Sequence, residues 1–131
     1  MESKRILIVD DDSTVQRILA RVFLRAGYAV ATASNGRQAL SKLAEARFDA
    51  LVSDIQMPKM TGRELVSQLA AEGPYLPGCV FIVTSHSESE ERGWVSEFPG
   101  VSVLEKPISP KEILRLVQQR LDGLTCEGSG D

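Results

Sequence analysis

The sequence has few cysteines, no long apolar run and no concentration of positive charge. Its two cysteines, Cys79 and Cys126, lack the spacing of a metal or redox motif, which predicts reduced thiols in a cytoplasmic protein. The apolar stretch after the N-terminal MESKR is too short for a signal peptide. No other segment approaches the roughly 20 apolar residues of a membrane span. The sequence therefore predicts neither a cleaved leader nor membrane insertion.

The balance of charge argues against direct contact with nucleic acid. The net charge is -3, and the lysines and arginines are spread along the chain. Proteins that bind nucleic acid usually gather these residues on one surface to neutralise phosphates. We therefore do not expect direct nucleic-acid binding.

The length and composition predict one folded domain and a short tail. A chain of 131 residues with 43% hydrophobic residues can bury an adequate core as a single domain. The segment after residue 122, GLTCEGSGD, is small, polar and rich in glycine. We predict that residues 1–122 form the domain and that 123–131 form a flexible tail or linker.

Short apolar runs alternate with stretches that have the apolar spacing of helices. The runs are RILIV at 5–9, YAVATA at 28–33, DALVS at 49–53, CVFIV at 79–83 and VSVL at 101–104. Helix starts are predicted by capping-box pairs at Ser13 and Gln16, Thr61 and Glu64, Ser87 and Glu90, and Ser109 and Glu112. Strands that are apolar throughout are typical of a parallel sheet with helices on both faces. This pattern predicts an α/β fold, a three-layer sandwich with a five-stranded parallel sheet and five helices.

Polar residues follow four of these five runs. They are Asp10, Asp11 and Asp12 after the first run, Asp54 after the third, Thr84 and Ser85 after the fourth, and Lys106 and Pro107 after the fifth. The carboxyl ends of parallel strands meet at one edge of the sheet, where ligands bind. The second run ends in the uncharged segment 33–36, which is expected to lie away from the site. The sequence thus predicts one polar site at this edge.

The carboxylates among these residues predict a site for a divalent cation. Carboxylates that crowd together repel one another unless a cation lies between them. Mg2+ (or Mn2+) prefers oxygen ligands and usually keeps several waters. We expect Asp11 and Asp54 to bind the metal directly, Asp10 to bind it through a water, and the backbone carbonyl of Gln56 to be a further ligand.

Lys106 and Thr84 do not suit the metal and instead predict an anion next to it. An ammonium group and a hydroxyl can both donate hydrogen bonds to anionic oxygens. A phosphoryl group is the anion that needs a metal, an ammonium and a hydroxyl together. Asp12 falls outside this set, and we expect it to lie at the start of the first helix with Ser13.

The whole pattern resembles the receiver domain of two-component response regulators. The matching motifs are VDD at 9–11, DIQMP followed by a glycine at 54–62, TS at 84–85 and KP at 106–107, and the resemblance covers about residues 4–122. It implies a flavodoxin-like sheet with the strand order 2-1-3-4-5. It also implies a cytoplasmic signalling domain of a phosphorelay, and not an enzyme acting on an external substrate.

The resemblance implies a role for each matching residue. Asp54 is the phosphoacceptor, which takes a phosphoryl group from the phosphohistidine of a histidine kinase or phosphotransfer protein. Asp10 and Asp11 match the magnesium-binding acids, Lys106 the phosphate-contacting lysine and Thr84 the switch hydroxyl.

The resemblance also implies residues that tune the switch and partners that receive its output. Gln56 and His86 match positions that tune the rate of phosphoryl chemistry, whereas Val103 stands where the family often has an aromatic residue that moves with the threonine. Trp94 is expected to belong to the core. The output would pass to a downstream protein or to an output domain linked to the chain in a longer parent. The resemblance also allows a homodimer through the fourth helix, fifth strand and fifth helix.

Two alternatives stay open at this point. Residues 10–14, DDDST, also match the D-x-D-x-T motif of haloacid-dehalogenase-type phosphatases, in which Asp10 would be the nucleophile. Those enzymes need a further acidic pair after the lysine, but the nearest acids, Glu112 and Asp122, fall inside the predicted last helix. The other alternative is a receiver-like interaction module that never takes phosphate, which the departure at Val103 keeps open.

Overall fold

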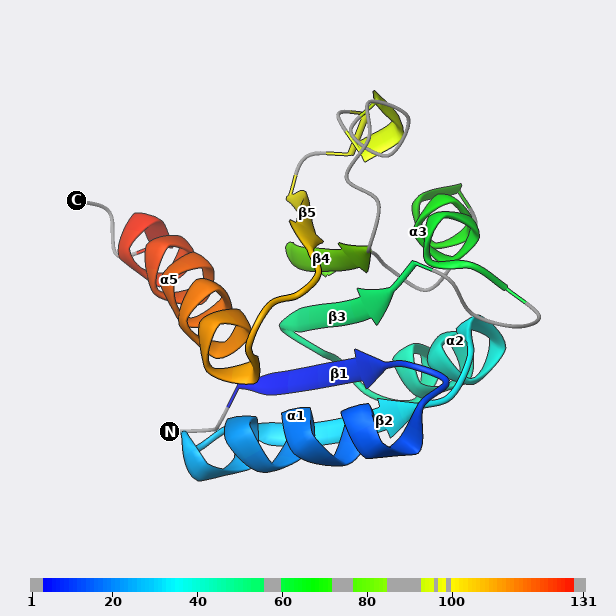
Figure 1. The fold of residues 1–131 in the computed structure, drawn as a ribbon. Helices are drawn as coiled ribbons and strands as arrows, with labels where there is room; N and C mark the ends of the chain where they lie inside the picture. The colour runs from blue at the N-terminus through cyan, green and yellow to red at the C-terminus, as the bar shows by residue number, and fades with distance from the viewer. Residues whose placement is uncertain are drawn as a thin grey trace.

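The computed structural model describes residues 4–55, 60–71, 77–84, 93–95, 97–98 and 100–128. Its elements are β1 (Arg5–Val9), α1 (Ser13–Arg25), β2 (Ala29–Ala33), α2 (Gly36–Glu45), β3 (Ala50–Asp54), α3 (Gly62–Ala71), β4 (Cys79–Thr84), β5 (Val101–Glu105) and α5 (Pro110–Gly128). All neighbouring strands pair in parallel, in the order β2-β1-β3-β4-β5 (Figure 1). The predicted fold class and strand order are therefore confirmed.

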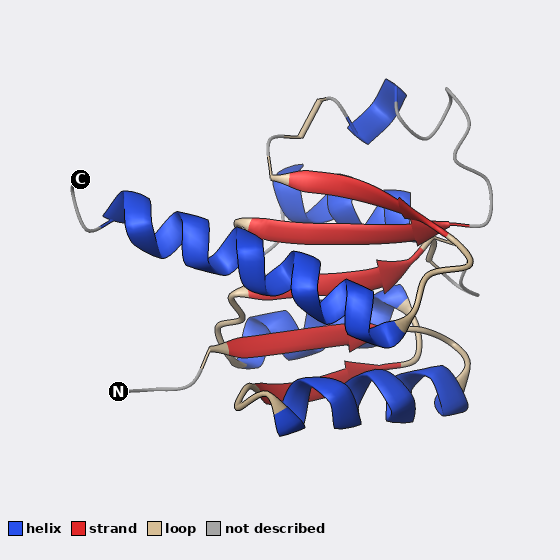
Figure 2. Cartoon of the chain, turned by 60° about the vertical axis from the view of Figure 1, so that its left-hand side comes forward, coloured by secondary structure: helices blue, strands red, loops and turns tan. Residues whose placement is uncertain are grey.

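Alternate residues of the strands build two cores, one on each face of the sheet. Ile6 and Ile8 of β1 pack with Leu19 and Phe23 of α1 in a cluster that also contains residues of α5. The strand residues that alternate with these, such as Leu7, pack with buried residues of α2 and α3. Figure 2 shows α1 and α5 in front of the sheet and α2 and α3 behind it. Because both faces are covered, the strands have no polar face, which explains their uniformly apolar sequences.

The buried cysteine is consistent with the predicted reduced thiol. Cys79 begins β4 and has no exposed surface. Burial raises the pKa of its thiol to about 11, and the nearby Arg120 only partly opposes this. The thiol is therefore protonated at neutral pH, in the form that is slow to react.

The predicted helix starts are confirmed for α3 and α5 but not for α1. Thr61 and Glu64 exchange side-chain to backbone hydrogen bonds of 2.9 and 3.1 Å, as a capping box requires. The Glu112 N–H donates to Ser109 Oγ at 3.1 Å, directly before Pro110 begins α5. The Ser87 and Glu90 pair lies outside the described residues.

At the start of α1 the predicted Ser13 and Gln16 pair is wrong. Asp12 is the N-cap, and its Oδ1 accepts the Thr14 N–H at 2.8 Å. Ser13 is already the first helical residue, so its side chain cannot cap the helix from outside. The expectation that Asp12 belongs to the helix start is borne out by this contact, and Gln16 is left available for other contacts.

Helix α5 extends to Gly128, so the stretch predicted to be flexible after residue 122 is helical over most of its length. A single glycine such as Gly123 costs a helix only about 1 kcal/mol relative to alanine, which does not stop a helix that is already formed. The division of the chain at residue 122 stays a prediction.

Residues 93–95 are helical where the fourth helix is expected, and Trp94 is only 4% exposed, as predicted for a core residue.

None of the helices in the described part of the chain combines the length and hydropathy needed to cross a membrane.

Candidate functional site

Three carboxylates meet at the carboxyl edge of the sheet. Asp10 directly follows β1, and Asp54 is the last residue of the neighbouring strand β3. One carboxylate oxygen from each of Asp10, Asp11 and Asp54 lies within 4.8 Å of the others. This separation suits one small cation that is held directly or through a water, and an all-oxygen donor set suits Mg2+. The residues that are present therefore fit the metal.

The environment of Asp10 makes the cluster electrostatically unfavourable without a cation. Asp10 is 7% exposed, and this burial raises the pKa of its carboxyl group. The charges of Asp54 and Asp11 raise the same pKa further, whereas Lys106 and the backbone N–H of Asp12 lower it. That N–H donates to Asp10 Oδ1 at 2.9 Å, which holds the carboxylate in place. A positive ion between these groups would relieve both the repulsion and the loss of hydration.

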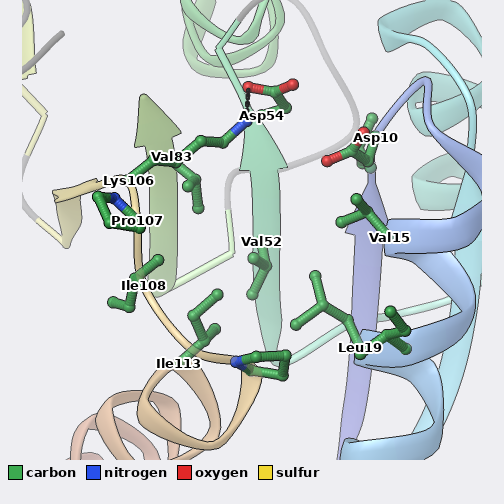
Figure 3. Close-up of a pocket in the computed structure, with 13 residues that line it drawn as sticks. Asp10, Val15, Leu19, Val52, Asp54, Val83, Lys106, Pro107, Ile108 and Ile113 are labelled. Atoms are coloured by element: carbon green, nitrogen blue, oxygen red, sulfur yellow. Dashed lines mark ion pairs between the residues drawn. The ribbon is translucent and has the colours of Figure 1, made fainter. Parts of the chain in front are cut away.

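A positive side chain approaches the cluster from the other side. Lys106 follows β5, and its Nζ lies 3.5 Å from Asp54 Oδ1 (Figure 3). The Lys106 N–H donates to the Thr84 carbonyl at 2.7 Å, which fixes the loop after β5 against the end of β4. The side chain of Lys106 is 43% exposed, so the ion pair adds little to stability. Its importance lies in placing an ammonium group next to a carboxylate.

Thr84 belongs to the same edge. It ends β4, one residue beyond Val83, which is the register partner of Asp54. Thr84 is 2% exposed, and among the residues that the structure describes it is one of four buried polar residues, all at or near the carboxyl end of a strand, the others being Asp10, Asn35 and Ser53. Gln56 and His86 lie outside the described residues. Val103 of β5 is partly buried against the core on the α2 and α3 side.

Helix α3 packs directly on the backbone of Asp54. The Gly62 N–H donates to the Ile55 carbonyl at 2.8 Å. A Cβ atom at Gly62 would lie 2.9 Å from the Asp54 carbonyl oxygen, closer than carbon and oxygen atoms normally approach. Only glycine permits this contact, and the first turn of α3 therefore supports the position of Asp54.

A pocket that the sequence did not predict lies beside the acids. It has a volume of about 570 Å³, and Asp10, Asp54 and Lys106 line its polar end. Its remaining lining is apolar and comes from α1, the strands and the start of α5, with Val15, Leu19, Val52 and Ile113 labelled in Figure 3. No sequence signal reports this space, because it depends on the separation between α1 and α5.

A second feature that the sequence missed is the position of Gln16. Its amide nitrogen donates to the backbone carbonyls of Asp10 and Ala33 and to the hydroxyl of Ser34. The sequence predicts that the segment 33–36 lies away from the site, and β2 is indeed at the edge of the sheet. Gln16 nevertheless joins the loop after β2 to the loop that carries the acids. The available signal was a polar residue in the first turn of the helix that follows Asp10 and Asp11.

Replacing Asp10 by asparagine is expected to stabilise the metal-free protein at neutral pH. Asparagine keeps an oxygen for the Asp12 N–H but removes a buried charge, and we expect the free energy of unfolding to rise by roughly 0.5–2 kcal/mol. Since the folded state raises the pKa of Asp10, the charged form reduces stability above that pKa. This loss of stability disappears as the pH falls through the raised pKa of folded Asp10 to the usual pKa of an aspartate.

Urea unfolding of Asp10→Asn at pH 7 and at about pH 4 tests this, because the gain over the parent protein should shrink in acid. Asp122→Asn, at an exposed position of α5, is the control and should change little. A loss of stability in Asp10→Asn at pH 7 without divalent cations would contradict the proposed electrostatics.

Comparison with known proteins agrees with this geometry. The family model for the response regulator receiver domain matches residues 6–118. The chain is 35% identical over 128 residues to the response regulator MprA of Mycolicibacterium vanbaalenii, a match that covers 97% of this chain and 54% of that protein. It is 34% identical over 121 residues to the DNA-binding transcriptional regulator NtrC of Salmonella typhimurium, covering 92% of this chain and 25% of that protein. The chain thus spans about half of the first relative and a quarter of the second.

Solved structures show the same fold. The chemotaxis response regulator CheY4 of Vibrio cholerae aligns with a TM-score of 0.81 and 31% identity, covering 90% of this chain and 98% of that one. A CheY-like receiver domain protein from Methanospirillum hungatei aligns with a TM-score of 0.84 and 27% identity, covering 96% and 99% of the two chains. With a family model that spans most of its length and relatives of this kind, the chain belongs to the response regulator receiver domains of two-component systems.

Proposed function

We propose that this chain is a magnesium-dependent phosphoacceptor switch in which Asp54 takes a phosphoryl group from the phosphohistidine of a histidine kinase or phosphotransfer protein. The observation that carries the proposal is the placement of Asp54 between two acids and an ammonium group. Its carboxylate lies within 4.8 Å of Asp10 and Asp11 and 3.5 Å from Lys106 Nζ. A carboxylate flanked in this way can attack an anionic group that it would otherwise repel.

The proposed transfer needs no external reactant besides the phosphodonor. An oxygen of Asp54 forms a bond to phosphorus, and the bond between phosphorus and the donor imidazole nitrogen breaks, with its electron pair returning to that nitrogen. Lys106 then interacts with the charge on the phosphoryl oxygens. Asp10, Asp11 and Asp54 would hold Mg2+, with the Gln56 carbonyl as a further proposed ligand, and the bound ion would screen the anionic oxygens from one another.

Phosphorylation is proposed to switch the affinity for a partner. The modification adds about -1.5 to -2 charges at Asp54. Thr84 and Lys106, which already share a backbone hydrogen bond, would reorient towards the new oxygens. Val103 cannot reproduce the movement of an aromatic ring, so we propose that Thr84 and the loop after it carry the change. Gln56 and His86 would tune the lifetime of the acyl phosphate.

The surface that changes is proposed to be formed by the fourth helix, β5 and α5. It would contact a downstream protein, a covalently linked output domain or a second copy of the chain. We place this signalling in the cytoplasm, since the proposed kinase chemistry and the reduced Cys79 belong there.

The phosphatase alternative is not favoured by the contacts of α5. Glu112 is engaged by Arg115, whose Nε lies 3.0 Å from its Oε1, and Asp122 is exposed on the same helix. Neither residue lines the pocket next to Lys106 or belongs to the acidic cluster. A module that never takes phosphate has no need for the cluster together with Lys106, which supports the phosphoacceptor over that alternative.

The test is to incubate the protein with Mg2+ and acetyl phosphate and to locate the labile phosphate by mass spectrometry. We expect one modification, on Asp54. It should require the metal, so EDTA added before acetyl phosphate should prevent it. Label on Asp10 would instead support the phosphatase. Absence of any label, with the protein folded and the metal bound, would leave only the interaction module.

A further inference from the structure

The side chain of Gln16 lies at a point where three oxygen atoms converge. Its Nε2 is 3.1 Å from the Ala33 carbonyl oxygen and 3.2 Å from Ser34 Oγ, and it makes a shorter hydrogen bond to the Asp10 carbonyl. Backbone carbonyls only accept hydrogen bonds, so the amide must present its NH2 group to them. Gln16 is partly buried and belongs to the first turns of α1.

These contacts connect two loops to one rigid helix. The first loop contains Asp10 and Asp11, and the second follows β2. The second loop is itself held by Gln38, whose Oε1 accepts the Ser34 N–H at 2.7 Å. The Asp10 N–H also donates to the Ala33 carbonyl at 3.0 Å. Gln16 therefore closes a network that fixes the path of the chain on leaving β1.

The Asp10 carbonyl matters because it belongs to the peptide group that leads to Asp11. Its orientation sets where the Asp11 backbone begins and thus where the Asp11 carboxylate can reach. Asp11 is exposed and its carboxylate is repelled by Asp10 and Asp54, so the three groups would separate if the loop were free. A hydrogen bond to this carbonyl opposes that separation and keeps the acids within 4.8 Å.

We infer that Gln16 is a positioning residue for the cation site, which holds the loop after β1 so that Asp10 and Asp11 are already arranged for Mg2+. The inference rests on the proposed function only in assigning Mg2+ to this cluster. Groups that orient metal ligands without touching the metal commonly change its affinity 10- to 100-fold when they are replaced. Gln16 does not touch the reacting atoms, and its loss should act on metal affinity and not on the chemistry at saturating metal.

The test compares the parent protein with Gln16→Met, which keeps the length of the side chain but has no N–H donors. Calorimetric titration with Mg2+ alone should show an affinity about 10-fold weaker in the variant. The Mg2+ concentration that half-saturates phosphorylation by acetyl phosphate should rise by a similar factor. The rate at saturating Mg2+ should stay within about two-fold, because Asp54 and Lys106 are unchanged.

Gln38→Met is the matched control. It removes the side-chain oxygen that accepts the Ser34 N–H, so it perturbs the same second loop and leaves the hydrogen bond from Gln16 to the Asp10 carbonyl in place. We expect its Mg2+ affinity to stay within about two-fold of the parent value, since the hydrogen bonds that orient the metal-binding loop remain. An equal weakening in Gln38→Met and Gln16→Met would show that the loop as a whole, and not Gln16, is responsible.

A second variant guards against a folding defect in the first. Gln16→Leu is uncharged and of similar size, and it too has no N–H to donate to the carbonyls of Asp10 and Ala33. It should weaken Mg2+ binding about as much as Gln16→Met. Thermal unfolding without metal reports whether each variant is folded, and parent-like Mg2+ affinity in a folded variant would overturn the inference.

Failure of this inference can be told apart from failure of the proposed function. If the parent protein binds Mg2+ but Asp54 is not phosphorylated, the proposed function fails and the titrations still decide the role of Gln16. If Asp54 is phosphorylated and Gln16→Met titrates like the parent protein, only the role of Gln16 fails.

Discussion

Replacing Asp54 by asparagine is expected to abolish phosphorylation by acetyl phosphate. The amide has nearly the same shape as the carboxylate, but its oxygen is a far weaker nucleophile and forms no acyl phosphate. The change also removes the negative charge that lies next to Lys106 Nζ and one of the three charges of the acidic cluster. The measurement is the mass increase of the intact protein after incubation with Mg2+ and acetyl phosphate.

The fold should survive this substitution, because Asp54 ends β3 and the charge of its side chain raises the pKa of Asp10 in the metal-free protein. Thermal unfolding without Mg2+ is therefore expected at or above the parent temperature. Asp49→Asn is a suitable control, since Asp49 is exposed at the opposite end of the same strand, where it accepts the Arg5 N–H. Phosphate that persists on folded Asp54→Asn would move the acceptor to another residue, with Asp10 the first to examine.

Replacing Lys106 by methionine is expected to slow phosphorylation of Asp54 by about 100-fold at saturating Mg2+. Removal of one preorganised donor from the site of developing charge typically costs a factor of 10² to 10³ in rate. Methionine preserves most of the aliphatic stem of Lys106 that lines the pocket, so the loss isolates the ammonium group. The rate is measured from the time course of label incorporation with acetyl phosphate.

Metal affinity should respond in the opposite direction to the rate. The positive charge of Lys106 lowers the pKa of Asp10, so Lys106 interacts with the acids. Removing this charge leaves the cluster more negative. Mg2+ should thus bind Lys106→Met as tightly as the parent protein or more tightly. Lys106→Arg keeps the charge and should recover part of the rate. Weaker Mg2+ binding in Lys106→Met together with an unchanged saturated rate would show that the lysine supports the metal site and not the transfer.

Much of the fold could be predicted because its determinants are local. Each strand is an apolar run bounded by polar residues, and β1 coincides with the run at 5–9. Uniform burial of such strands requires helices on both faces, which leads to a parallel three-layer arrangement. Once the strands are parallel, the residues that follow β1, β3, β4 and β5 must share one edge. The sequence therefore predicts one shared site for Asp10, Asp11, Asp54, Thr84 and Lys106.

The sequence prediction was wrong at the start of α1, where neighbouring residues compete for the same local role. Asp12 and Ser13 are both good N-cap residues, and the sequence pattern favoured Ser13 because Gln16 follows it at the right spacing. The structure selects Asp12, since the chain enters α1 one residue earlier. The boundary at residue 122 stays a prediction, and α5 continues past it to Gly128 because helix ends depend on small differences in free energy that one residue type does not decide.

By itself, the sequence determined the class of the fold, the strand segments and the types of side chain at the polar edge, because periodicity and strand-end chemistry are written in consecutive residues. Only the tertiary structure decided which oxygens approach within 4.8 Å, that Lys106 reaches Asp54, that Gln16 joins the loops after β1 and β2, and that a pocket of about 570 Å³ adjoins the acids. The pocket and the contacts of Gln16 depend on where α1 and α5 pack, whereas the approach of the acids and Lys106 depends on how the strands pair. Such separations are set by side chains far apart in the sequence, which no local pattern encodes.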